Sequence, residues 1–229
     1  GPAPGLPTPV RERMAEAALR LCTSQQYEGA GTVEFIVDAS TFEFYFLEMN
    51  TRIQVEHAVT EMNTDYDLVA LQIDYAMRAI ERLDQDAVAV HGHSIECRVY
   101  AENPDKQFLP SPGPLARFRL PPESCALRIE TGYREGDRIT HFYDPMLAKF
   151  ISHGSDRNGA IEKMIDSLRR TEIAGVTTNL AFLQSILRHP CFRGGELSTA
   201  FVGEYKDDLI RQVVPANGTE AGVSVSGST

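Results

Sequence analysis

The feature that most constrains the fold is the segment 47–57, in which apolar and polar residues alternate. Side chains point to opposite faces of a β-strand with a period of two, so this pattern predicts a strand with two unlike faces. One face would meet the core with Leu47, Met49, Thr51, Ile53 and Val55. The other would carry the polar series Glu48, Asn50, Arg52, Gln54 and Glu56, with Phe42, Phe44 and Phe46 preceding it on the same parity.

This polar series contains carboxylates, amides and a guanidinium group, which can bind a hard cation through oxygen and an anion through the guanidinium. The β-like run 32–37 and the turn residues 38–41 precede it, so we expect an antiparallel hairpin that brings Glu34 near Glu48. Two carboxylates this close repel unless a divalent cation lies between them, and magnesium with nucleotide phosphates fits that position. The alternative is a solvated strand with cross-strand ion pairs.

The rest of the chain predicts an α+β protein. Helical periodicity covers residues 8–22 and continues from Asp65 or Asp67 to about residue 80. Short strands are expected at 94–100, 115–120 and 126–130, followed by a helix from Ser155 or Asp156 to Leu168 and another from an Asn179 cap to about 189. The low-complexity end, 214–229, is expected to be disordered.

Composition excludes several classes of function. The chain has 32 acidic and 22 basic residues, for a net charge of −10, so we expect no nucleic-acid partner. It has no apolar run near the ~20 residues that span a membrane and no signal peptide, so we expect a soluble protein of the cytoplasm, or of the mitochondrial matrix in a eukaryote. The four cysteines lie far apart in apolar contexts, so we expect buried, reduced thiols rather than a disulfide or zinc framework.

Several words of the sequence resemble one family. They are GAGTVEF at 29–35, FYFLEMNTRIQVEH at 44–57, IECRVYAE at 95–102 and YDPMLAK at 143–149. They resemble the biotin carboxylase component of biotin-dependent carboxylases, an ATP-grasp family, over about residues 2–205. The resemblance implies the back half of an ATP-grasp domain at 1–90, the biotin carboxylase C-terminal sheet-plus-helix domain at 91–205 and a disordered tail at 206–229. The RIETG segment at 128–132 is most similar to acyl-CoA carboxylase α subunits.

The resemblance implies ATP-dependent carboxylation of carrier-bound biotin with bicarbonate, through carboxyphosphate, by a carbon–nitrogen ligase. The positions matching the family's site for Mg²⁺ or Mn²⁺ are Glu34, Glu48 and Asn50. The positions matching its bicarbonate site are Arg52, Gln54 and the Val55 backbone, and Glu56 matches the base. Arg98 matches the residue that stabilises negative charge on the biotin ureido oxygen, where a guanidinium contributes most in the transition state.

The resemblance also implies partners: a biotin carboxyl carrier domain, a carboxyltransferase subunit or domain, and a second copy of the intact enzyme. The family's glycine-rich loop and ATP-gripping lysines have no counterpart here, so we expect a fragment with negligible ATP turnover alone. Two other hypotheses are a catalytically silent module that binds a carrier or subunit, and a different ATP-grasp ligase. Arg98 could instead simply pair with Glu96 or Glu102, and Lys149 is expected to have a structural or subunit-contact role.

Overall fold

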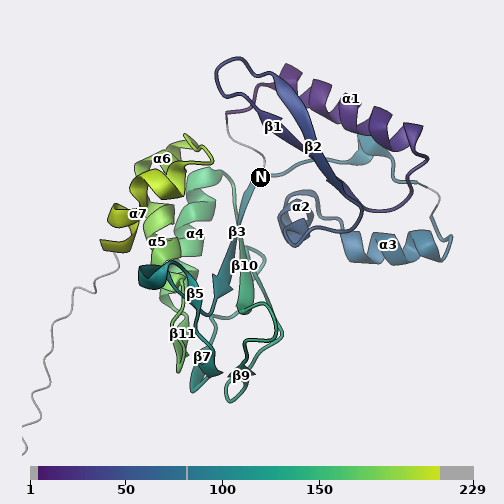
Figure 1. The fold of residues 1–229 in the computed structure, drawn as a ribbon. Helices are drawn as coiled ribbons and strands as arrows, with labels where there is room; N and C mark the ends of the chain where they lie inside the picture. The colour runs from purple at the N-terminus through teal and green to yellow at the C-terminus, as the bar shows by residue number, and fades with distance from the viewer. Residues whose placement is uncertain (1–4, 81, 212–229) are drawn as a thin grey trace, which may run out of the picture.

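The computed structural model describes residues 5–80 and 82–211, which form two regions joined near residue 90 (Figure 1). The first region contains three helices and a two-stranded hairpin: α1 (Thr8–Ser24), β1 (Thr32–Val37), β2 (Phe44–Asn50), α2 (His57–Thr64) and α3 (Leu68–Ala76). Helix α1 runs alongside the hairpin, and the Arg13 guanidinium lies 5.5 Å from the centre of the Phe44 ring. The short 3-10 helix η1 (Gln85–Ala87) follows on the way to the second region.

The hairpin is antiparallel and has one irregularity. Glu34, which was expected near Glu48, pairs directly with it, but the next pair is Phe35 with Phe46, so Leu47 is an extra residue in β2. This bulge shifts the parity of the strand. Phe44 and Phe46 therefore pair along the side of Phe35, and the prediction that they share the face of Glu48 is wrong.

The predicted strand is also too long. β2 ends at Asn50, which pairs with Thr32, the first residue of β1, so the following residues have no strand to pair with. Residues 51–56 form a turn, and the helix α2, which the sequence analysis did not predict, begins at His57. The apolar face was expected to meet the core, but Leu47 is 60% exposed.

The second region is built on a three-stranded antiparallel sheet with the order β3-β10-β8. Its strands are β3 (His93–Tyr100), β8 (Leu127–Thr131) and β10 (Met146–Gly154). Three separate two-stranded sheets accompany it: β4 (Glu102–Asn103) with β5 (Leu109–Pro110), β6 (Gly113–Pro114) with β9 (Arg138–Ile139), and β7 (Arg117–Arg119) with β11 (Glu172–Ala174). The 3-10 turn η2 (Pro104–Lys106) connects β4 to β5.

The main core lies between this sheet and the helices α4 (Arg157–Arg169), α5 (Leu180–Arg188) and α6 (Pro190–Gly194). Helix α7 (Phe201–Arg211) packs on α5, where Phe201 and Leu209 form a second, smaller core with Phe182. Helix α4 begins where expected, because the Asp156 side chain accepts a hydrogen bond from the Gly159 backbone at 2.8 Å. Fully buried residues such as Val99, Phe150 and Ile161 pack between sheet and helices.

Two expectations about the end of the chain and the thiols change. Residues 206–211 belong to α7 rather than to a tail, and the remainder of the expected tail lies outside the described residues. All four cysteines are free, but of the predicted buried thiols only Cys97 is buried, and burial raises its pKa to about 12. Cys125 is exposed because it lies in the turn before β8. Across residues 5–80 and 82–211, no helix combines the length and apolar character that crossing a bilayer requires.

Candidate active site

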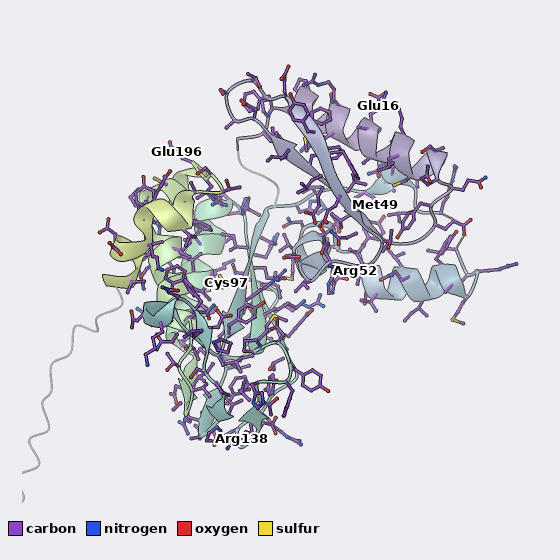
Figure 2. The ribbon with its side chains drawn as sticks, viewed as in Figure 1. Glu16, Met49, Arg52, Cys97, Arg138 and Glu196 are labelled. Carbon is purple, nitrogen blue, oxygen red and sulfur yellow. The ribbon has the colours of Figure 1, made fainter. Side chains whose placement is uncertain are left out.

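A cleft of about 780 Å³ lies where the two regions meet. Its lining comes from the loop before β1, from β1 itself, from the turn between β2 and α2, from α2, from the start of α3 and from Arg98 on β3. Figure 2 places Arg52 where the hairpin meets α2 and α3. The cleft contains five of the predicted site side chains, which are Glu34, Arg52, Gln54, Glu56 and Arg98.

The three predicted metal-binding side chains lie together at the open end of the hairpin. The Asn50 side-chain nitrogen donates to Glu34 Oε1 at 2.8 Å and to Glu48 Oε1 at 3.2 Å. The two carboxylates are cross-strand partners, so the sheet register and one amide hold three oxygen-bearing groups at one place. The two carboxylates supply oxygen donors that suit Mg²⁺ or Mn²⁺, and Asn50 would add a third if its amide turned its oxygen, which now faces Arg52, toward them.

Arg52 and Gln54 also contact this cluster, although both residues lie after the end of β2. Arg52 Nη1 donates to Gln54 Oε1 at 3.0 Å, and Gln54 Nε2 donates to Glu34 Oε1 at 3.1 Å. Arg52 Nη1 also reaches the Ile53 carbonyl at 3.0 Å, which fixes the turn. The polar series therefore converges through a turn stabilised by its own side chains and not through strand alternation.

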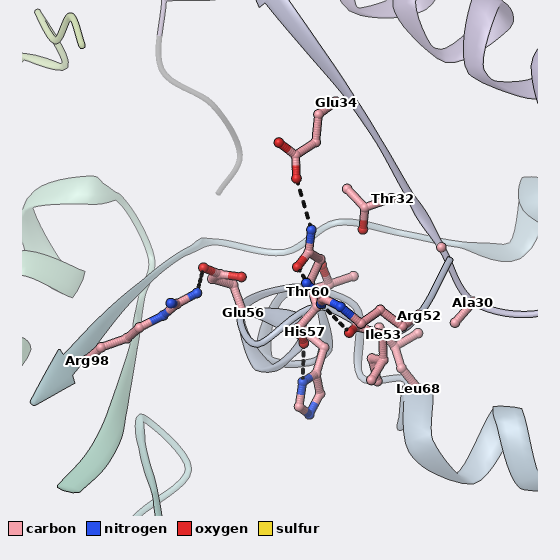
Figure 3. Close-up of a pocket in the computed structure, with 12 residues that line it drawn as sticks. Ala30, Thr32, Glu34, Arg52, Ile53, Glu56, His57, Thr60, Leu68 and Arg98 are labelled. Carbon is pink, nitrogen blue, oxygen red and sulfur yellow. Dashed lines mark hydrogen bonds and ion pairs between the residues drawn. The ribbon is translucent and has the colours of Figure 1, made fainter. Parts of the chain in front are cut away.

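Glu56 and Arg98 face each other across the cleft (Figure 3). Arg98 Nη2 makes a close ion pair with Glu56 Oε1, although the two residues are 42 positions apart. Arg98 is itself held from behind, since the buried Asn179 side chain accepts from the Tyr100 backbone at 2.9 Å and donates to the Arg98 carbonyl at 3.1 Å. Asn179 thus precedes α5 as expected, but its side chain binds β3 and does not cap the helix.

Lys149 connects the second region to the turn that carries the site. Its ammonium donates to the Val55 carbonyl at 2.7 Å and pairs with Glu130 Oε2 at 2.5 Å. Burial acts to raise the pKa of Glu130, but the hydrogen bond and charge of Lys149 outweigh it and lower that pKa. The predicted structural role of Lys149 is thus the positioning of the Val55 backbone.

Helix α2 supplies a second connection through Glu61, which is 7% exposed. Glu61 Oε1 accepts from the Leu68 backbone at 2.7 Å, and Oε2 accepts from Arg128 Nη1 at 2.6 Å. Burial opposes the charge of Arg128, but this hydrogen bond to Glu61 and the nearby Glu130 raise the pKa of its guanidinium. His57 is within 4.0 Å of Glu61, and its Nδ1 lies 2.8 Å from the Gln54 carbonyl, so His57 packs at the turn.

Behind Arg98 lies a further carboxylate, Glu96, whose side chain is 4% exposed. Its Oε1 is 3.9 Å from Arg98 Nε, so the weak pairing that the sequence suggested exists beside the closer pair with Glu56. Burial raises the pKa of Glu96 to about 7, against the opposing charge of Lys149.

Sequence reasoning expected a structural or subunit-contact role for Lys149 without finding its partner, and it missed the contacts of Glu61 and Asn179. Lys149 is signalled by a single cation in the otherwise apolar run Met146–Ile151, and Glu61 by an acid in a helix-forming segment. Nothing in the local pattern signals Asn179, because its hydrogen bonds reach a strand 79 residues earlier. Thr60 and Leu68 also line the cleft and were not predicted to do so.

Comparison with known proteins finds matches to two domain models. Residues 96–204 match the model of the biotin carboxylase C-terminal domain, and residues 1–83 match the ATP-binding domain of the carbamoyl-phosphate synthase L chain. Residues 1–83 are thus similar to the back part of an ATP-grasp domain, and residues 96–204 are similar to the biotin carboxylase C-terminal domain.

Among individual relatives, the chain is 45% identical to methylcrotonoyl-CoA carboxylase subunit alpha of Rattus norvegicus over 224 residues, which is 98% of this chain and 31% of the relative. It is 43% identical to biotin carboxylase 1 of Bacillus subtilis, over 89% of this chain and 45% of the relative. The chain thus spans less than half the length of these curated relatives.

Among solved structures, the biotin carboxylase domain dimer of the Hydrogenobacter thermophilus 2-oxoglutarate carboxylase, in complex with MgADP, ADP and bicarbonate, matches with a TM-score of 0.87. The sequences are 36% identical, and the match covers 95% of this chain and 47% of that one. The Kluyveromyces lactis urea carboxylase matches with a TM-score of 0.81 and 44% identity, over 87% of this chain and 17% of that one.

Proposed function

We propose that this chain provides the metal, bicarbonate and biotin side of a biotin carboxylase active site, in an enzyme that carboxylates carrier-bound biotin at the expense of ATP. The observation that supports it is the convergence of Arg52, Gln54, Glu56 and Arg98 with Glu34 in one cleft. Arg98 comes from a different region from the other four, so the cleft forms only when the two regions fold together.

In this proposal Glu34, Glu48 and Asn50 hold Mg²⁺ or Mn²⁺. The amide already draws both carboxylates toward one point. When bound there, the ion would neutralise charge on the nucleotide phosphates. The chain's own contribution is to offer oxygen donors from two paired strands at the edge of the cleft.

Arg52 and Gln54 bind the bicarbonate anion together with the Val55 backbone, whose carbonyl is fixed by Lys149. A guanidinium suits a planar oxyanion because its donors form a rigid fork. Glu56 accepts the proton of bicarbonate as the anion attacks the γ-phosphate and displaces ADP. The carboxyphosphate formed would break down to carbon dioxide and phosphate beside biotin. The N1′ nitrogen of biotin would then exchange its proton, which the phosphate accepts, for the carboxylate. Arg98 stabilises the negative charge that develops on the ureido oxygen of biotin.

The wider assembly is part of the same proposal. A biotin carboxyl carrier domain brings biotin to the cleft, and a carboxyltransferase subunit or domain takes the carboxylated product to an acyl acceptor. The acyl-CoA carboxylase type is supported by 45% identity to a methylcrotonoyl-CoA carboxylase subunit alpha. We further propose the division at 1–90 and 91–205, a homodimeric intact enzyme, and a location in the cytoplasm or mitochondrial matrix.

The test is a chimaera in which this chain replaces the matching segment of the Bacillus subtilis biotin carboxylase 1, with which it aligns over 204 residues. Bicarbonate-dependent ATP hydrolysis and carboxylation of free biotin are measured, with the unaltered Bacillus enzyme as reference. We expect both activities, and a loss of about 10²-fold or more in kcat for biotin carboxylation when Arg98 becomes Ala. Glu56→Gln is expected to abolish turnover with bicarbonate.

A folded chimaera that binds the carrier but neither hydrolyses ATP nor carboxylates biotin contradicts the proposal and supports a silent carrier-binding module. An active chimaera whose turnover ignores Arg98→Ala supports a different ATP-grasp ligase. The matched control is Arg117→Ala, which removes a guanidinium of the second region that pairs with Glu172, and neither residue lines the cleft.

A further inference from the structure

Glu96 is a buried carboxylate that the proposed mechanism does not use. Its side chain is 4% exposed, and within the part of the chain that the structure describes neither oxygen accepts a hydrogen bond. A buried charge without hydrogen bonds is costly, so such a group is expected to serve a purpose that the resting structure leaves unfilled.

The nearest cation to Glu96 is the guanidinium that lines the cleft. Arg98 Nε lies 3.9 Å from Glu96 Oε1, too far for a hydrogen bond but within the range of an ion pair. The opposite end of the same guanidinium, Nη2, contacts Glu56. The Arg98 guanidinium therefore lies between two carboxylates, that of Glu56 in the cleft and that of Glu96 behind it.

The sheet explains why Glu96 stays in place. Arg98, Lys149 and Glu130 are neighbours across β3, β10 and β8, and Glu96, Ile151 and Arg128 form the next row. These rows share one face, which packs against α2, where Glu61 and His57 lie. The charged groups around Glu96 are thus Arg98 on its own strand, Lys149, Arg128 and Glu130 on the neighbouring strands, and the two residues of α2.

The burial of Glu96 and the charged groups around it determine its pKa. Burial raises its pKa to about 7 and Glu130 pushes in the same direction, whereas Lys149 and Arg128 favour the charged form. The charge of Glu96 therefore depends on the balance between its burial and the cations on the neighbouring strands.

We propose that Glu96 is a positioning residue for Arg98, whose Nε it binds when Nη2 leaves Glu56 to meet substrate. This inference rests on the proposed function, in which Glu56 accepts a proton and thereby loses its attraction for the guanidinium. Glu96 then balances the charge of Arg98 from behind and keeps the outer edge of the guanidinium directed into the cleft. Without it, Arg98 would lose its direction at the moment when charge develops on biotin.

The experiment follows the Arg98 Nε–Hε resonance by ¹⁵N NMR in the 229-residue chain between pH 5 and 9, assigned by its disappearance in Arg98→Lys. In the wild type we expect it to shift with a midpoint near 7. Glu96→Gln should abolish this shift, Glu96→Asp should retain it, and Glu172→Gln should leave it unchanged. Glu56→Gln should enlarge the shift, because Arg98 then has only Glu96 as a partner.

A resonance that titrates equally in Glu96→Gln and in the wild type, or does not titrate at all, overturns the proposal. Backbone amide spectra confirm that each variant is folded, and Glu96→Asp keeps the carboxylate if Glu96→Gln is unstable. In the chimaera, Glu96→Gln should lower kcat about 10-fold with KM for bicarbonate unchanged, and flatten the pH profile around 7.

The two proposals fail separately. The NMR measurement needs no substrate, so an inactive chimaera with a normal Glu96 titration removes the proposed function alone. An active chimaera whose Arg98 resonance ignores Glu96 removes only the positioning role.

Discussion

The two regions of the molecule are stabilised in different ways. In the second region, apolar residues of β3, β10 and α4 form a continuous buried core. In the described part of the first region the buried apolar side chains are Val10 and Ala58, while hairpin residues such as Ile36, Tyr45 and Phe46 are more than half exposed. The region that carries most of the chemistry therefore has little core of its own.

The first region is instead connected to the second by charged side chains. Lys149 reaches the Val55 carbonyl, and Arg128 reaches Glu61 on α2. Each connection ends on the turn or the helix beside the cleft. We infer from this comparison that side chains on the sheet of the second region hold the turn and the helix of the site in place.

The largest expected effect tests the core itself. Phe150 on β10 is fully buried, so Phe150→Ala should lower the free energy of unfolding by about 3–5 kcal/mol. Tyr45→Ala in the hairpin, where the side chain is 59% exposed, should change it by less than about 0.5 kcal/mol. Urea unfolding followed by circular dichroism measures both. Equal losses at the two positions would contradict the contrast between the regions.

The next effect tests the connection between them. Lys149→Met keeps the apolar stem of the side chain but removes both the donor to Val55 and the partner of Glu130, which should cost about 1.5–3 kcal/mol. Hydrogen exchange of the amides at 51–57 should quicken while that of α4 stays unchanged. If the turn remains protected, its own hydrogen bonds, such as Arg52 to the Ile53 carbonyl, suffice to hold it.

A smaller effect concerns pH. The pKa of Glu96 is raised from 4.5 to about 7 in the folded protein, so the folded state binds the proton more tightly than the unfolded chain does. Its contribution to stability is fully present below pH 4.5 and is lost as the pH rises through 7. The melting temperature of the wild type should therefore fall between pH 5 and 8 relative to that of Glu96→Gln. A constant difference between the two across this range would contradict the raised pKa.

The sequence allowed the elements with a clear period or a clear cap to be predicted. Helix α1, the closeness of Glu34 to Glu48, and α4 after Asp156 were predicted correctly because each depends on neighbouring residues. The extended strand to Val55 was wrong, because strand length depends on the partner, and β1 begins only at Thr32. The alternation of 51–56 instead reflects residues that converge through a turn.

The site was predicted as a set of residues but not as a geometry. The alternation of residues 48–56 predicted several of the site residues, and the family resemblance added Arg98. The groups that hold them, Lys149 and Asn179, act over 94 and 81 positions of sequence, so no local pattern reveals their partners. Long-range contacts of this kind follow from the way the sheet brings distant strands together.

The smallest expected effect concerns an exposed ion pair, and it tests whether a charged pair stabilises this protein only where the pair is buried. Arg117 on β7 donates from Nε to Glu172 on β11 at 2.7 Å, a geometry as good as that of Lys149 with Val55. Both side chains of the Arg117 pair are more than a third exposed, so water competes for each and Glu172→Gln should cost less than about 1 kcal/mol. The same urea titration measures it, with added salt weakening the wild type toward the variant. A loss as large as that of Lys149→Met would mean that the short hydrogen bond, and not its burial between the two regions, stabilises the site.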